Sequence, residues 1–89
     1  MKIKGGFSLR KIAGMWVVLP LGARTLDFTG VLTLNETGRM LWELLAEGSN
    51  RPELAEALVS EYDIPIEQAQ ADVNEFLESL VSAGCLAAE

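Results

Sequence analysis

The chain has 89 residues, of which 49% are hydrophobic and 22% are charged. A chain of this size folds as a single domain, 1–89, and hides only roughly 60–65% of the surface that its unfolded form exposes, which excludes a two-domain enzyme and disfavours a deep catalytic pocket. It contains no histidine and one cysteine, Cys85. Zinc fingers, Ser/His/Asp triads and disulfide frameworks therefore lack their parts, and we predict no catalytic residue, no metal and no cofactor. Cys85 is expected to be a small apolar filler of the core.

Charge is divided unevenly along the chain. The total is −6, yet residues 1–34 carry five bases against one acid, and no base follows Arg51. The acidic second half is typical of a solubilising surface, or of a surface that attracts basic peptide or protein and repels nucleic acid. No signal-peptide pattern follows the basic start, and no run approaches the ~20 apolar residues that span a bilayer. We therefore expect a cytoplasmic protein.

The first part of the chain is predicted to form three strands. β-branched and aromatic residues occur in short runs that are separated by Gly14 and by a Pro-Leu-Gly turn signal at 20–22. These runs predict strands near 7–12, 15–19 and 26–34. In the third run apolar residues alternate with mixed ones, which places one face on a core.

Three amphipathic segments follow and predict three helices. The first covers about 36–47 after a cap at Asn35, the second extends from a capping box at Asn50 to about Tyr62, and the third runs from Pro65 to just before Gly84. The second helix is expected to lie on the first. The third has the longest apolar stripe, and we expect part of it to lie in a groove. The predicted fold is α+β, a three-stranded antiparallel sheet followed by three helices.

This order of elements fits a winged-helix DNA binder or a protein- or peptide-recognition module. DNA readout needs cations toward phosphates and bases, but the second helix has only Arg51, at its start, and the third helix has acids and no base. Catalysis by paired carboxylates is disfavoured because these acids lie on solvated helix faces. Peptide or protein recognition remains.

The third predicted strand is an edge that can accept another strand. Natural proteins protect such edges with Lys, Arg or Pro. The first strand, at the opposite edge, has Arg10 and Lys11, whereas no base or proline occurs between Thr25 and Gly38. Either a peptide pairs with this edge, or a neighbouring helix or a second copy of the chain covers it.

Two sequence blocks carry a resemblance to a known family. They are Leu34-Asn35-Glu36-Thr37-Gly38 and Leu41-Trp42-Glu43-Leu44-Leu45, and they stand at a fixed distance from Asp72-Val73 and Phe76-Leu77. From about Phe7 to Leu86 the sequence closely resembles the PqqD family. Its members are winged helix-turn-helix-like peptide chaperones, known as RiPP recognition elements.

The resemblance implies a non-catalytic role. Such a domain captures the leader segment of a ribosomally synthesised precursor peptide and presents it to a modifying enzyme, often a radical SAM protein, which we expect to be a separate chain. In the family the peptide lies as an added strand on the third strand, with side chains in a groove against the third helix. The implied peptide-binding residues are Thr29, Gly30, Val31, Leu32, Thr33, Ala69, Asp72, Val73 and Phe76. Residues Asn35, Gly38 and Trp42 match the family best and are expected to be architectural.

The resemblance leaves open whether the final product is pyrroloquinoline quinone or another modified peptide. Two other roles for the chain also stay open. The chain is also compatible with a structural homodimer that seals the edges of the third strand, and with a degenerate winged-helix regulator.

The acidic helices predict that the protein binds neither duplex nor single-stranded DNA. Residues 52–89 carry nine acids and no base. Because attraction to phosphate is strongest at low salt, we expect no binding to a random-sequence duplex in ~50 mM salt, measured by fluorescence anisotropy. Submicromolar affinity under these conditions would contradict the charge argument.

Overall fold

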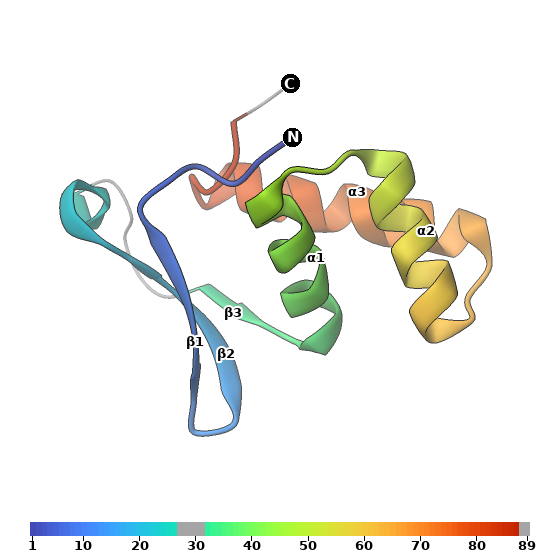
Figure 1. Cartoon of the computed structure of the whole chain (residues 1–89), viewed down its shortest axis with the longest axis horizontal. Helices are drawn as coiled ribbons and strands as arrows, with labels where there is room; N and C mark the ends of the chain where they lie inside the picture. Colours follow the sequence, from blue (N-terminus) through green and yellow to red (C-terminus); the bar gives the residue numbers. More distant parts are fainter. Residues whose placement is uncertain (27–31, 88–89) are drawn as a thin grey trace.

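A three-stranded antiparallel sheet precedes three helices in the computed structural model, which describes residues 1–26 and 32–87 (Figure 1). This confirms the predicted α+β fold. The strands are β1 (Phe7–Ile12), β2 (Met15–Pro20) and β3 (Leu32–Leu34), in the spatial order β1-β2-β3. The helices are α1 (Glu36–Glu47), α2 (Arg51–Tyr62) and α3 (Ile66–Ser82).

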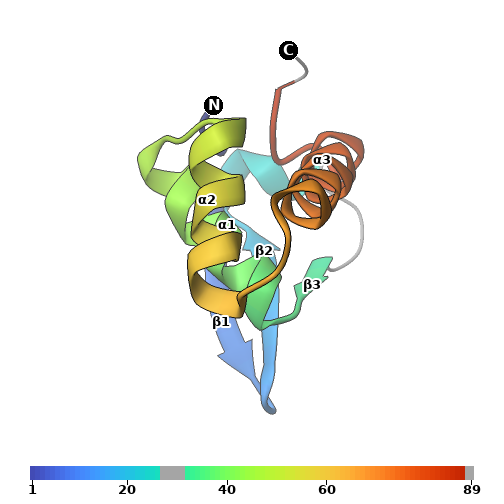
Figure 2. The same cartoon turned by 90° about the vertical axis from the view of Figure 1, so that its right-hand side faces the viewer.

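β1 and β2 form a hairpin with a two-residue turn. Ile12 pairs with Met15, and the turn residues Ala13 and Gly14 have φ angles of 52° and 81°. Two positive φ angles match the right-handed twist of the flanking strands. Glycine adopts such a conformation freely, whereas alanine adopts it at a cost. The turn lies well beyond the helices in Figures 1 and 2.

The prediction for the third strand was wrong at its start. Residues Gly22–Leu26 form a short 3-10 helix, η1, rather than an approach to the strand. Two hydrogen bonds hold this turn: the Thr25 hydroxyl donates locally to the carbonyl of Gly22 at 2.8 Å, and the Arg24 Nε donates to the carbonyl of Gly5, in the N-terminal segment, at 2.9 Å. The predicted strand residues 27–31 lie outside the described residues.

Asparagine caps begin α1 and α2 as predicted. The Asn35 side chain accepts from the backbone N–H of Gly38 at 2.8 Å, and the Asn50 side chain accepts from that of Glu53 at 2.9 Å. Each cap satisfies an N–H that has no partner within its helix. The Glu53 carboxylate contacts the side-chain amide of Asn50 at 3.2 Å instead of its backbone. Pro65 precedes α3 as its cap residue rather than lying in its first turn.

The prediction that α2 lies on α1 was wrong, because α2 packs mainly on α3 and only slightly on α1. The apolar stripe of α3 is the longest of the molecule, and α2 covers much of it because Leu54, Ala55 and Leu58 are buried. Most of the stripe is therefore core, as shown by the residues of α3 that are at most 2% exposed, Ala69, Val73, Leu77 and Leu80. Cys85 is fully buried, as expected of a core filler, and burial raises the pKa of its thiol.

Candidate functional site

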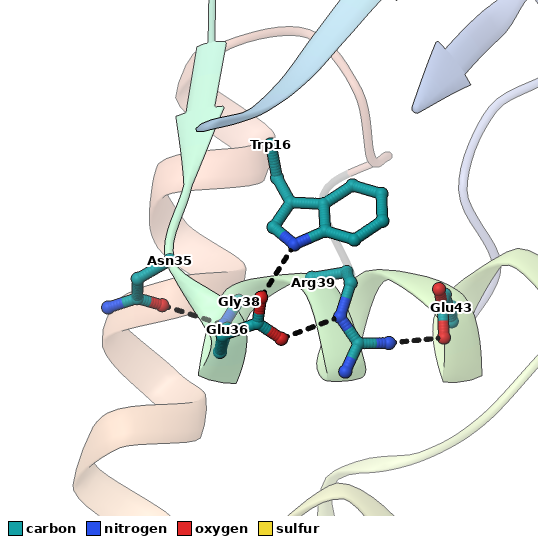
Figure 3. Close-up of polar contacts among 6 residues, drawn as sticks. All are labelled: Trp16, Asn35, Glu36, Gly38, Arg39 and Glu43. Atoms are coloured by element: carbon teal, nitrogen blue, oxygen red, sulfur yellow. Dashed lines mark hydrogen bonds and ion pairs between the residues drawn. The ribbon is translucent and has the colours of Figure 1, made fainter. Parts of the chain in front are cut away.

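The site is built around the junction where β3 passes into α1. The register places Leu34 of β3 opposite Trp16 of β2, and Asn35 follows at once as the cap of α1. The Trp16 Nε1 donates to the Glu36 carboxylate at 2.8 Å (Figure 3). Sheet and helix are thus hydrogen-bonded to each other within two residues of the end of β3.

Cations and carboxylates extend this junction along α1. The Arg39 guanidinium donates to Glu36 at 3.1 Å and to Glu43 at 2.8 Å, and it lies over the Trp16 ring at 5.5 Å (Figure 3). Lys11 of β1 lies over the same ring, also at 5.5 Å. The Trp16 indole hydrogen bond and the Arg39 guanidinium hold the pKa of the Glu36 carboxyl below its usual value. The Trp16 indole of β2 is therefore held in place by side chains of β1 and α1.

Gly38 allows α3 to approach the same junction. A Cβ atom at this position would lie 3.3 Å from the Phe76 ring, from Leu34 and from the Asn35 side chain. Such contacts are tight, so a glycine suits the place where β3, α1 and α3 meet. Together with the Asn35 cap and the burial of Trp42, which is only 4% exposed, this agrees with the architectural roles expected for the best-matched motif residues.

A groove of about 390 Å³ lies between the start of α1 and the middle of α3. Its lining residues are Asn35, Thr37, Gly38, Leu41, Asp72, Glu75, Phe76 and Ser79. Because β3 leads directly into Asn35, the end of this edge strand adjoins the groove, and Figure 2 shows β3 on the same side of the molecule as α3.

The predicted helix residues divide between two faces of α3. Asp72 and Phe76, one turn apart, both line the groove and are half-buried. Ala69 is fully buried, and Val73 is 1% exposed and lines a different hollow, between α2 and α3. The structure thus brings Asp72 and Phe76 together beside β3 and places Ala69 and Val73 in the core.

The structure describes only two of the five predicted peptide-binding residues of the strand. Leu32 and Thr33 pair with Val18 and Val17 of β2, and the Thr33 side chain is exposed. The predicted contacts of the remaining three, Thr29, Gly30 and Val31, lie outside the described residues.

Sequence reasoning missed several residues of the groove. Ser79 lies three residues beyond Phe76 and Glu75 three beyond Asp72, so helical spacing alone places them beside the predicted pair. Thr37 and Leu41 come from α1, and no spacing rule within the sequence brings them against α3. Asp72 and Glu75 give the groove an acidic wall, and its lining includes no base.

Comparisons with known proteins agree with this architecture. The family described as "Coenzyme PQQ synthesis protein D (PqqD)" matches residues 16–86. The chain belongs to the PqqD family. Members of this family are non-catalytic peptide-binding proteins, so we describe the chain as a binding protein and not as an enzyme. No curated protein matches the chain at a significant level.

Two solved structures are similar to this PqqD-family chain. TbiB1 in complex with the TbiA(beta) leader peptide is 26% identical with a TM-score of 0.79, over 100% of this chain and 98% of that chain. Lasso peptide synthetase B1 complexed with the leader peptide is 23% identical with a TM-score of 0.75, over 94% of this chain and 93% of that chain. The second likeness concerns the fold.

The described part of this PqqD-family chain offers neither a membrane-spanning helix nor a cluster of metal ligands. Within residues 1–26 and 32–87, no helix has the length and apolar character needed to cross a membrane. In the same part of the chain, no group of three or more Cys, Asp or Glu side chains is arranged to hold a metal ion.

The Glu36 carboxylate predicts a pH dependence of stability. Its pKa is lowered in the folded state. Its contribution to the free energy of unfolding is therefore present above the unfolded pKa and is lost as the pH falls through the folded pKa. In Glu36→Gln we expect the free energy of unfolding to decline less steeply between about pH 5 and pH 3, measured by urea denaturation.

Glu61→Gln is the matched control, since it removes an exposed carboxylate from α2, away from Trp16. We expect its profile to stay close to that of the wild type. Parallel pH profiles for the wild type and Glu36→Gln would contradict a stabilising role of the Glu36 carboxylate.

Proposed function

We propose that the protein binds the leader segment of a ribosomally synthesised precursor peptide by adding it as a strand to the outer edge of β3, beside α3. It then presents the peptide to a separate modifying enzyme, for which the family resemblance suggests a radical SAM protein. The observation that carries the proposal is the edge of β3 next to the groove at Phe76. In residues 1–26 and 32–87 no strand pairs with this outer edge.

Strand addition suits this edge for a physical reason. In an edge strand, half of the backbone N–H and C=O groups point away from the sheet and can pair with an incoming chain. Such pairing supplies affinity without matching side chains, and pockets for alternate side chains supply specificity. The groove between α1 and α3 adjoins the end of β3 and offers a place for those side chains.

The groove residues divide into contact and support roles in this proposal. Phe76 forms an apolar wall, and Asp72 on the rim favours a cationic or hydrogen-bond-donating group of the leader. Leu32 and Thr33 supply the described part of the strand surface. Ala69 and Val73 are buried and hold α3 in place rather than touch the peptide.

The ligand is proposed at the level of a leader peptide. The family description names coenzyme PQQ synthesis, whereas one structural neighbour is lasso peptide synthetase B1. Both similar structures are complexes with a leader peptide, which supports this ligand class without selecting a product.

Strand addition is tested by N-methylation of the leader of the precursor peptide from the same organism. Each methyl group removes one backbone donor, so methylation at alternate leader positions should weaken binding and methylation between them should not. The net loss of one hydrogen bond is about 1 kcal/mol, which is roughly a fivefold loss of affinity. Fluorescence titration of singly methylated peptides measures this pattern.

Two outcomes would overturn the binding mode. The first is a tight-binding leader whose affinity is unaffected by methylation at every position. The second is a homodimer, seen by sedimentation, that does not bind the leader and is not dissociated by it. This result would assign the β3 edge to a second copy of the chain.

Asp72 is tested by Asp72→Asn, which keeps size and removes charge. Asp72 accepts from the Gln68 amide at 2.8 Å, and asparagine retains an oxygen for this bond, so folding should change little. A rim ion pair contributes ~0.2–1 kcal/mol, so leader binding should weaken only a few-fold and become less sensitive to salt.

Glu78→Gln is the control for Asp72→Asn, because Glu78 lies on α3 and does not line the groove at Phe76. Its leader affinity and salt slope should match those of the wild type. Identical affinities and salt slopes for wild type and Asp72→Asn would remove Asp72 from the site.

A further inference from the structure

β2 is apolar on both of its faces. Its sequence, Met-Trp-Val-Val-Leu-Pro, contains no charged residue. An antiparallel strand with one solvated face normally alternates apolar and polar residues, whereas a continuous apolar run is typical of a strand that is covered on both faces. One layer of cover for β2 comes from the helices of this chain.

The register and the packing assign the side chains of β2 to their faces. Trp16 bonds to Glu36 of α1, and Val18 is fully buried in the core with the helices. Successive side chains of a strand point to opposite faces, so Met15, Val17 and Leu19 face away from the helices. In agreement, the described core cluster does not include Val17, although this side chain is only 9% exposed.

The hairpin partner adds to this outer face. Ile12 stands opposite Met15 and Arg10 stands opposite Val17, so both share the face of their partners. We call the four apolar residues of this face, Ile12, Met15, Val17 and Leu19, the outer patch; only Ile12 and Met15 are exposed, since Val17 is buried and Leu19 is half-buried.

The exposed end of the outer patch lies at the turn of the hairpin. Ile12 is 51% and Met15 is 55% exposed. The two side chains are cross-strand neighbours at the end of a hairpin that extends past the helices (Figure 1). Adjacent apolar side chains that water surrounds mark interaction sites more often than single exposed ones do.

Charge indicates the kind of partner. Arg10 is exposed on the same face, and its Nε donates to the Ser8 hydroxyl at 3.1 Å. β1 and β2 contain no acidic residue. A twofold dimer through this face would place the same patch of both copies together, including both Arg10 side chains, with no carboxylate from either hairpin. A different protein with carboxylates beside an apolar surface is complementary in charge.

We propose that the exposed end of the outer patch, Ile12 and Met15, together with Arg10 is the docking surface for the peptide-modifying enzyme, whose contact surface is apolar with carboxylates at its rim. The identity of the partner rests on the proposed function. None of the outer-patch residues lines the groove at Phe76, so the docking surface and the groove do not share a described residue. The hairpin is also held in advance, because Trp16 lies under both Lys11 and Arg39, and a rigid surface loses less entropy on binding.

The test measures binding of the full chain to the purified peptide-modifying enzyme of the same organism, by calorimetry. The double variant Ile12→Thr/Met15→Thr removes the exposed apolar groups while threonine keeps a residue that suits strands. Its affinity for the enzyme should fall roughly tenfold or more, because both side chains lose apolar burial in the complex. Its affinity for the leader should stay unchanged.

Matched controls separate docking from general loss of apolar surface. Ile66→Thr/Val81→Thr changes two residues of α3 that are 42% and 38% exposed, and it should leave enzyme affinity unchanged. Arg10→Glu should weaken enzyme binding further at low salt than at high salt, whereas Lys2→Glu, at an exposed cation outside the hairpin, should not.

Each remaining outcome overturns the docking surface. These outcomes are equal enzyme affinity of the wild type and Ile12→Thr/Met15→Thr, no enzyme binding by the wild type, or a wild-type homodimer that the double variant dissociates. The proposed function fails separately: loss of leader binding with retained, patch-dependent enzyme binding would sink the leader proposal and leave the docking surface in place.

Discussion

The arrangement of the whole molecule depends on the five-residue junction between β3 and α1. Asn35 caps the helix, Glu36 accepts the hydrogen bond of Trp16 from the sheet, and Gly38 lets the Phe76 ring of α3 approach. These contacts lie within four residues, so they set the direction of β3, the start of α1 and the distance to α3 together. Asn35, Thr37, Gly38 and Leu41 line the groove opposite α3, so the same motif that resembles the family also forms one wall of the site.

Small size explains why the site occupies only one flank of α3. A domain of this length needs nearly every apolar side chain for its core. The stripe of α3 is accordingly buried, with α2 as its main neighbour, and the flank with Asp72, Phe76 and Ser79 is what remains beside β3. Among the described residues, a peptide on this flank would meet an acidic wall and the Phe76 ring.

The division of charge along the chain becomes a division in space. The bases lie mainly in the N-terminal segment and the hairpin, while most of the described acids lie on the helices. Opposite parts of one small domain therefore present different surfaces, an acidic groove beside β3 and an apolar, basic outer sheet face. Two surfaces of opposite charge suit a protein that holds two different partners, because each partner is disfavoured at the other's surface.

The sequence by itself determined the order of the elements, both asparagine caps and most helix bounds, because caps, turns and apolar periodicity are local properties. It also indicated an open third strand and placed Asp72 and Phe76 on the helix beside it. Only the tertiary structure decided that α2 packs on α3, that Val73 turns into the core while Phe76 lines the groove, and that residues 22–26 form a 3-10 turn. Helical spacing identifies which residues share a stripe, but neighbouring positions such as Val73 and Asp72 differ by about 100° around the helix. Which edge of the stripe stays open depends on where the other elements lie, and this is set by contacts between segments far apart in the chain, such as Gly38 with Phe76.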